Sequence, residues 1–420
     1  MARPRRHHDA IIIGARCAGA TLAILLADAG WDVLLVDHRP APAAVMSSHI
    51  VFPNTVARLA EIGVLERMTA NHRIGRNRYF IDTLGHSFAE GFTPVDGFDY
   101  GIAPRRELLD KTLLDIALEK PRVSALLGPR VVDLVFSSTD EDRVTGVRLD
   151  SGETHHASWV FGADGRGSTV AGRLGLPKTR EMAGNWSALY TYWRGLRPAS
   201  DGCARLIARE DVVFSQAWCE DDLSLLFVGV PPGEERGGQG RRLDTFLAAV
   251  ERTPGAPRRQ ELEQAEMVGP VRAVPESALR GFFRTPAGPG WALIGDACHF
   301  KHPATGQGIS DALSQASFVA TALCAGDGDL AGYESWRDEQ AAEHYDFAYQ
   351  MGRFPRPGIL DDVYAGLAAD ADARQGFIDI FSRQKLPYTD VFTAERITAW
   401  QSPRPTADHA PRALAGASNR

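Results

Sequence analysis

Two short apolar runs near the start of the chain flank a glycine-rich turn and a helical stretch. Residues 9–13 (DAIII) predict a buried strand, ATLAILLADAG predicts a helix that ends at Gly30, and WDVLLVD predicts a second buried strand that ends at Asp37. Strand, helix and strand in this order predict a βαβ unit of a parallel sheet. The opening MARPRRHH imitates a secretory signal, but Arg16 interrupts the apolar stretch, so we favour the structural interpretation.

The rest of the chain mixes helical and strand periodicity, which predicts an α/β fold. Apolar spacing predicts helices over 55–68, 106–119, 242–252, 307–325 and 330–350. Alternation and turn residues predict strands within 76–103, three strands within 131–161, and further strands over 187–193, 211–218, 223–230 and at the start of WALIGDACH. After about residue 402 the composition predicts a frayed tail.

Composition narrows the class of protein. The chain has 420 residues, of which 44% are hydrophobic and 24% charged, as in a globular protein of two or three domains. The net charge of −7 disfavours a nucleic-acid partner. No apolar run approaches the length of about 18 residues that a membrane span needs. Five scattered cysteines without a CxxC pair, and no histidine or acidic cluster with ligand spacing, predict neither disulfides nor a metal site, and we expect a cytoplasmic protein.

The turn between the first strand and helix has the sequence GARCAG, from Gly14 to Gly19. Backbone N–H groups at such a helix start bind a pyrophosphate. Asp37 ends the second strand, where a carboxylate accepts a hydrogen bond from a ribose hydroxyl and repels a 2′-phosphate, so the turn suits FAD or NAD better than NADP. Arg16 replaces the usual middle glycine, and its guanidinium can face the pyrophosphate. Cys17 lies where a thiolate would be stabilised, although packing beside the pyrophosphate is the simpler role.

Two later segments also contain residues that could bind a cofactor. The first is FGADGRGSTV, at 161–170, and the second is WALIGDACHFKHPATGQGISDA, at 291–312. In the second segment a buried strand ends at Gly295, and Asp296 follows where a polyol hydroxyl could be bound. Pro303 and residues 306–308 lead into a helix whose N-terminal amides would stabilise negative charge on a reduced flavin.

In this order and at these separations, the three motifs resemble the class A flavoprotein monooxygenases, the family of p-hydroxybenzoate hydroxylase, and the related geranylgeranyl-reductase-like FAD-dependent oxidoreductases. The resemblance covers about residues 9–350. It implies a Rossmann-like FAD-binding domain of the glutathione-reductase type with an inserted antiparallel β-sheet substrate domain and C-terminal helices. The implied boundaries are 1–75, 104–178 and 286–350 for the FAD-binding domain, 76–103 and 179–285 for the substrate domain, and 351–420 for the C-terminal helical segment and flexible tail.

The resemblance also assigns roles to individual residues. The ADP half of FAD would be held by Gly14, Arg16, Cys17, Ala18, Gly19, Asp37, His38 and Arg39. Arg106 would also reach FAD. The pyrophosphate would lie near Asp164 and Gly165, and the ribityl chain near Gly295 and Asp296. The flavin ring would be lined by Pro303, Gly306, Gln307, Gly308 and Ile309. Ser310 stands where the monooxygenases usually have Asn. His299, His302 and Pro303 are the candidates for catalytic contacts, although either histidine could simply bond the backbone of its loop.

Aromatic residues of the insert are the candidates for the substrate pocket: Tyr190, Tyr192, Trp193, Phe214, Trp218 and Phe227. Alternation along a strand places Tyr190 and Tyr192 on one face and Trp193 on the other, so not all of them can line one pocket. For each, ordinary sheet core is the alternative.

The resemblance implies a monooxygenase that uses NAD(P)H and dioxygen to hydroxylate or epoxidise a small aromatic or polyketide-like substrate through a flavin hydroperoxide. Only one dinucleotide motif is visible, so NAD(P)H would bind transiently. The main alternative is an FAD-dependent reductase or dehydrogenase of an unsaturated lipid or polyketide. A flavin-dependent halogenase is disfavoured. That family needs a lysine beyond the flavin tunnel and carries a WxWxIP motif, whereas here no lysine precedes Lys111 and no two tryptophans lie two residues apart. A flavin-binding redox partner without a substrate pocket is the non-enzymatic alternative.

Overall fold

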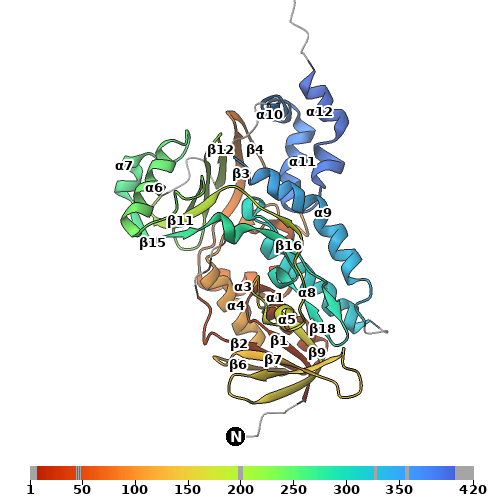
Figure 1. Cartoon of the computed structure of the whole chain (residues 1–420). Coiled ribbons are helices and arrows are strands. Elements are labelled where there is room, and N and C mark those ends of the chain that lie inside the picture. Colours follow the sequence, from red (N-terminus) through yellow and green to blue (C-terminus); the bar gives the residue numbers. More distant parts are fainter. Residues whose placement is uncertain are drawn as a thin grey trace, which may run out of the picture.

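The computed structural model describes residues 7–402 except for 44, 46, 48, 197–201, 326–328 and 355–358. Figure 1 shows a parallel sheet with its helices in the lower half, a second sheet above it, and C-terminal helices along the right side and the top. The predicted tail after residue 402 lies outside the described residues. No helix among the described residues is long and apolar enough to cross a membrane.

The first sheet has the strand order β17-β18-β9-β1-β2-β6, with β8 on β9 and β7 on β8. The pairs β18–β9, β9–β1, β1–β2 and β2–β6 are parallel, as the βαβ pattern predicts. The pattern missed β6, whose VSALL sequence has little strand character of its own. The strands are β1 (His7–Ile13), β2 (Val33–Asp37), β6 (Val123–Leu127), β7 (Val131–Phe136), β8 (Val144–Leu149), β9 (Thr154–Gly162), β17 (Ala287–Gly288) and β18 (Trp291–Leu293).

Helices cover this sheet and complete one apolar core, in which Leu22, Leu113 and Val319 pack with the buried strand residues. They are α1 (Cys17–Asp28), α4 (Arg106–Glu119), α5 (Thr169–Arg173) and α8 (Gly308–Cys324). The helix predicted over 55–68 is in fact two, α2 (Pro53–Glu61) and α3 (Val64–Asn71). The helix breaks because Gly63 takes a left-handed conformation with φ of 75°.

The second sheet has the order β15-β11-β14-β13-β12-β3-β4, with β5 on β3. Its pairs are antiparallel, as expected for the insert, except that β3 and β12 are parallel. The chain returns to the first sheet between these two strands, and such a crossover permits parallel pairing. The strands are β3 (Arg76–Thr83), β4 (His86–Glu90), β5 (Gly101–Ile102), β11 (Ser187–Arg194), β12 (Cys203–Ala208), which was not predicted, β13 (Val213–Trp218), β14 (Leu223–Val230) and β15 (Glu266–Val274).

Each face of the second sheet packs against different helices. On one face Phe246 packs with Leu189 and Val228, and the helices there are α6 (Gln239–Glu251) and α7 (Arg259–Gln264). On the other face Phe347 and Phe377 belong to the core that joins the sheet to the C-terminal helices. These are α9 (Tyr333–Met351), α10 (Ile359–Ala369), α11 (Ala371–Phe381) and α12 (Ala394–Gln401) (Figure 1).

A small third sheet joins the two halves of the chain. It consists of β10 (Thr179–Met182), β16 (Gly281–Phe283) and β19 (His299–Phe300). Directly after β19, the 3-10 turn Pro303–Thr305 leads into α8. We call residues 299–308 the flavin loop. The small sheet therefore fixes the flavin loop between the parallel sheet and the insert.

Candidate functional site

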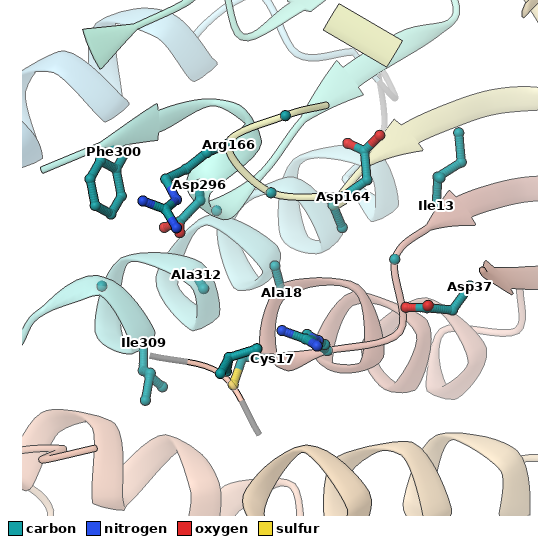
Figure 2. Close-up of a pocket in the computed structure, with 18 of the residues that line it drawn as sticks. Ile13, Cys17, Ala18, Asp37, Asp164, Arg166, Asp296, Phe300, Ile309 and Ala312 are labelled. Atoms are coloured by element: carbon teal, nitrogen blue, oxygen red, sulfur yellow. The ribbon is translucent and has the colours of Figure 1, made fainter. Parts of the chain in front are cut away.

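A cavity of about 680 Å³ lies at the carboxyl ends of the parallel strands. Its lining includes the residues that directly follow β1, β2, β9 and β18, which is where open α/β sheets bind their ligands. In Figure 2, Asp37 lies on one side of this cavity and Asp296, with Arg166, on the other, while the first turn of α1 lies between them.

Most of the residues that the sequence singled out for the cofactor line this one cavity: Gly14, Arg16, Cys17, Ala18, Asp37, His38, Arg39, Arg106, Asp164, Gly165, Gly295, Asp296, Gly306, Gly308 and Ile309. The three catalytic candidates, His299, His302 and Pro303, also line it. Gly19 and Gln307 are not among the lining residues: Gly19 packs against the backbone of Gly14, and the side-chain amide of Gln307 bonds to the carbonyl oxygen of Ile380.

The two glycines that bound the glycine-rich turn have no room for a side chain. Gly14 has φ of 105°, and a Cβ there would lie 2.4 Å from the carbonyl oxygen of Ala163. A Cβ on Gly19 would lie 1.8 Å from the carbonyl oxygen of Gly14. This close backbone packing opens the start of α1 to the cavity, where its free N–H groups can bind an anion such as a pyrophosphate.

Asp37 holds the turn as well as facing the cavity. Its Oδ2 accepts a hydrogen bond of 2.9 Å from the backbone N–H of Ala15, and its Oδ1 accepts one of 2.8 Å from the N–H of Arg39. A carboxylate has about four acceptor positions, so it can still accept from a ribose hydroxyl.

Cys17 is bound into a buried polar chain. Its thiol donates to Asp110 Oδ1 at 3.1 Å, and Arg106 donates to the same carboxylate at 2.8 and 3.0 Å. Burial raises the pKa of the Cys17 thiol, so a thiolate does not form here. The role of Cys17 is packing and hydrogen bonding, and Asp110 was not foreseen from the sequence.

The FGADGRG segment closes the cavity from the β9 side. Asp164 Oδ2 accepts from the N–H of Thr169 at 2.6 Å, while its buried Oδ1 has no hydrogen-bond partner among the described residues. Burial raises the pKa of Asp164. The guanidinium of Arg166 lies 4.8 Å from the centre of the Phe300 ring, and its charge opposes the rise that burial causes in the pKa of Asp296.

His299 has a defined protonation state. Gln315 Oε1 accepts from the N–H of Gly295 at 2.8 Å and from the hydroxyl of Tyr333 at 3.2 Å, so the Gln315 amide nitrogen faces His299 Nδ1 at 3.0 Å. Burial lowers the pKa of His299, so the ring is neutral and carries its proton on Nε2, which points to Asp311 at 3.5 Å.

His302 is fully buried in an aromatic surrounding. Its ring centre lies 4.5 Å from that of Trp186 and 5.4 Å from that of Tyr349, and its Nδ1 accepts from the N–H of Ala304. Burial lowers the pKa of His302 to about 3. Both loop histidines are therefore neutral and buried, and neither presents a free charged group to a substrate.

Residues at the end of α11 and directly after it bind the flavin loop and the start of α8. The amide of Gln307 donates to the carbonyl oxygen of Ile380 at 2.8 Å. Arg383 forms an ion pair with Asp311, and Lys301 Nζ lies 2.7 Å from the same carboxylate. Sequence reasoning missed this cluster; Lys301, the only lysine within residues 291–312, was the one available signal.

The aromatic candidates of the insert divide between the two faces of the second sheet. Tyr190, Tyr192 and Phe227 share the face toward the C-terminal helices. Trp193 and Phe214 lie in the core under α6, and Trp218 has the same strand parity as Phe214. The structure therefore does not bring Trp193, Phe214 and Trp218 to the same pocket as the tyrosines, because α6 covers their face.

His49, which sequence reasoning also missed, joins the tyrosine face. Its Nε2 is hydrogen-bonded to the hydroxyl of Tyr192, and its buried Nδ1 has no partner among the described residues. Burial and the nearby charge of Arg106 lower the pKa of His49 to about 3. The tyrosine face reaches the cofactor cavity through Trp186, whose ring centre lies 5.5 Å from that of Phe227 and 4.5 Å from that of His302, a residue of the cavity lining. No group of side chains among the described residues has the composition of a metal site.

Comparison with known proteins agrees with this geometry. The chain is 27% identical to the menaquinone reductase of Mycolicibacterium smegmatis, over 82% of this chain and 83% of the relative. It is 26% identical to the 6-methylpretetramide 4-monooxygenase of Streptomyces rimosus, over 76% of each chain. A flavoprotein/dehydrogenase from Cytophaga hutchinsonii has the same fold, with a TM-score of 0.78 over 94% of this chain and 99% of that one at 18% identity.

The family model described as "FAD binding domain" matches residues 7–348. This range includes the glycine-rich turn, the FGADGRG segment and the flavin loop, and the cavity has the backbone cradle and the paired carboxylates that a flavin dinucleotide needs. The chain belongs to the FAD binding domain family, and FAD is its cofactor.

Proposed function

We propose that this protein is an FAD-dependent monooxygenase that uses NAD(P)H and dioxygen to hydroxylate or epoxidise a small aromatic or polyketide-like substrate. The observation that carries the proposal is the buried aromatic face of Tyr190, Tyr192 and Phe227, which packs through Trp186 against His302 in the wall of the cofactor cavity. Relatives named as monooxygenases of 6-methylpretetramide and of 2,4-dichlorophenol support the substrate class.

The bound FAD would supply the redox chemistry, and the chain would position and shield the reactants. Asp37 and the first turn of α1 would hold the ADP half, and Asp296 and the flavin loop would hold the flavin half. Neutral His49 and His302 keep the surroundings of the loop free of histidine charge. We also propose the division into FAD-binding residues 1–75, 104–178 and 286–350, an insert of 76–103 and 179–285, and a C-terminal segment from 351.

The purified protein tests this proposal. It should be yellow, with the absorption spectrum of FAD, and phenolic or polyketide compounds should stimulate its oxidation of NAD(P)H. Turnover under ¹⁸O₂ should place one labelled oxygen atom in the product. Protein that holds FAD but inserts no labelled oxygen into any member of such a panel would contradict the monooxygenase function.

A reductase is the second candidate, because a relative of comparable coverage is named a menaquinone reductase. A reductase needs no dioxygen, so the two candidates separate in an anaerobic assay. A reduced quinone or polyene formed from NAD(P)H without dioxygen would favour the reductase, whereas strict dependence on dioxygen would favour the monooxygenase.

A further inference from the structure

Lys301 lies inside the flavin loop with its side chain buried at 2% exposure. Its Nζ lies 2.7 Å from Asp311 Oδ2, in the first turn of α8. Arg383, which follows α11, forms an ion pair with the other oxygen of this carboxylate, and its Nη1 donates to the carbonyl oxygen of Gln340 at 2.7 Å. Two cations therefore share one buried carboxylate.

The groups around Lys301 do not balance this charge. On β19, burial lowers the pKa of His299, and on α9, burial lowers that of His344 to about 2, so both rings are neutral. Asp296 is the other acid that acts on Lys301, but Arg166 and Arg106 influence Asp296 more strongly than Lys301 does. One positive charge remains in the wall of the cofactor cavity.

Two cations on one carboxylate leave an excess of positive charge while Lys301 is protonated, and an anion bound in the cavity would be stabilised by it. Lys301 and Asp311 both line the cofactor cavity, together with Pro303 and Gly306. We propose, on the basis of the FAD-dependent function above, that the cluster of Lys301, Asp311 and Arg383 raises the reduction potential of the bound FAD by stabilising the negative charge that the cofactor gains on reduction.

This effect depends on pH. Burial and the charge of Arg383 lower the pKa of Lys301 from the usual value of 10.5 to about 7. Below this pH the ammonium is charged and the cluster keeps its excess positive charge. Above it Lys301 becomes neutral, the cluster has no net charge, and the stabilisation of reduced FAD is lost.

The midpoint potential of FAD in the whole protein, measured by equilibration with a reference dye, tests the proposal. At about pH 6, Lys301→Met should shift the potential to more negative values by about 30 mV or more, which corresponds to a tenfold change in the ratio of reduced to oxidised cofactor. At about pH 9, where wild-type Lys301 is neutral, the two proteins should agree closely. Lys301→Arg keeps its charge throughout and should retain a high potential at both pH values.

A second variant tests the charge of the cluster, and a third controls for general damage. Arg383→Gln removes the other cation of the cluster, so its potential should also become more negative at about pH 6. Lys178→Met removes an exposed lysine outside the cavity and should leave the potential unchanged. FAD content and circular dichroism show whether each variant is folded.

Equal potentials for wild type and a folded, FAD-loaded Lys301→Met at about pH 6 would overturn the proposal, as would an unchanged potential for a folded Arg383→Gln. A failure of the proposed enzymatic function would give a different result. A charge-dependent shift in a protein that neither oxygenates nor reduces any tested substrate would support the cluster and contradict the proposed function.

Discussion

The carboxylate of Asp37 accepts a 2.9 Å hydrogen bond from the backbone N–H of Ala15, which ties the end of β2 to the glycine-rich turn after β1. One side chain thus fixes the shape of the turn and borders the cavity at the position expected for a ribose. Its loss would affect both at once.

Asp37→Ala should raise the Kd for FAD by about ten- to a hundredfold. Hydrogen bonds to a charged group contribute about 1.5–3 kcal/mol each, and each 1.4 kcal/mol changes a Kd by about tenfold. Titration of the apoprotein with FAD, followed by quenching of flavin fluorescence, measures the change. Asp28→Ala is the control, because Asp28 pairs with Lys120 on the surface and lies outside the cavity. An unchanged Kd for Asp37→Ala would show that the carboxylate does not border the bound cofactor.

Gly19→Ala should abolish FAD binding or destabilise the protein by about 1–3 kcal/mol, because the added methyl group would overlap the carbonyl oxygen of Gly14. Gly172→Ala is a matched control: it lies in a helix, and its Cβ would meet no atom within 4 Å. FAD content and the thermal melting temperature report both effects. A Gly19→Ala protein with wild-type values for both would contradict the close packing of the turn.

Cys17 should resist alkylation although it lies at a helix start. It is buried, its thiol donates to Asp110, and burial raises its pKa, whereas Cys324 is exposed. Native protein treated with iodoacetamide at about pH 8 should be labelled at Cys324 and not at Cys17, as read by mass spectrometry of peptides. Equal labelling of the two thiols would mean that a reactive thiolate is present at the turn.

His302 should make the protein sensitive to acid. Burial lowers its pKa from 6.5 to about 3, so between these values the unfolded chain binds a proton that the folded one does not. Stability is therefore lost as the pH falls below about 6.5, by about 1.4 kcal/mol per pH unit for this group.

His302→Asn keeps an acceptor for the N–H of Ala304 and removes the titration. Urea unfolding between about pH 6.5 and pH 4 should show a slope that is smaller by about 1.4 kcal/mol per pH unit than in the wild type. The same measurement on His156→Asn, an exposed histidine on β9, is the control. The same slope in wild type and His302→Asn would show that His302 is accessible to protons in the folded protein.

The two faces of the second sheet should respond differently to substitution. Tyr190→Phe removes a hydroxyl from the face beside the cavity and should lower kcat/KM by about tenfold, with little change in stability. Trp193→Phe removes buried area under α6 and should lower stability by about 1–3 kcal/mol while kcat/KM is kept. Steady-state kinetics with the best substrate and urea unfolding provide the comparison; the reverse pattern would place the pocket on the α6 side.

The sequence alone determined the βαβ start, the glycine-rich turn, Asp37 and the flavin loop. These features are local: an apolar run bounded by turn residues fixes a strand, and a Cβ on Gly19 would overlap the carbonyl oxygen of Gly14 in the same turn. Alternation also separated Tyr190 from Trp193 correctly, because neighbouring side chains of a strand point to opposite faces.

Only the tertiary structure decided which face of the insert adjoins the cofactor, because that depends on where α6 and the C-terminal helices pack. It also brought His49 to Tyr192, and Arg383 to Asp311 and Lys301. Each of these contacts joins residues from distant segments, and their burial removes the water that would otherwise screen their charges. No local pattern encodes such proximity, so the charge beside the flavin loop became visible only once the chain was folded.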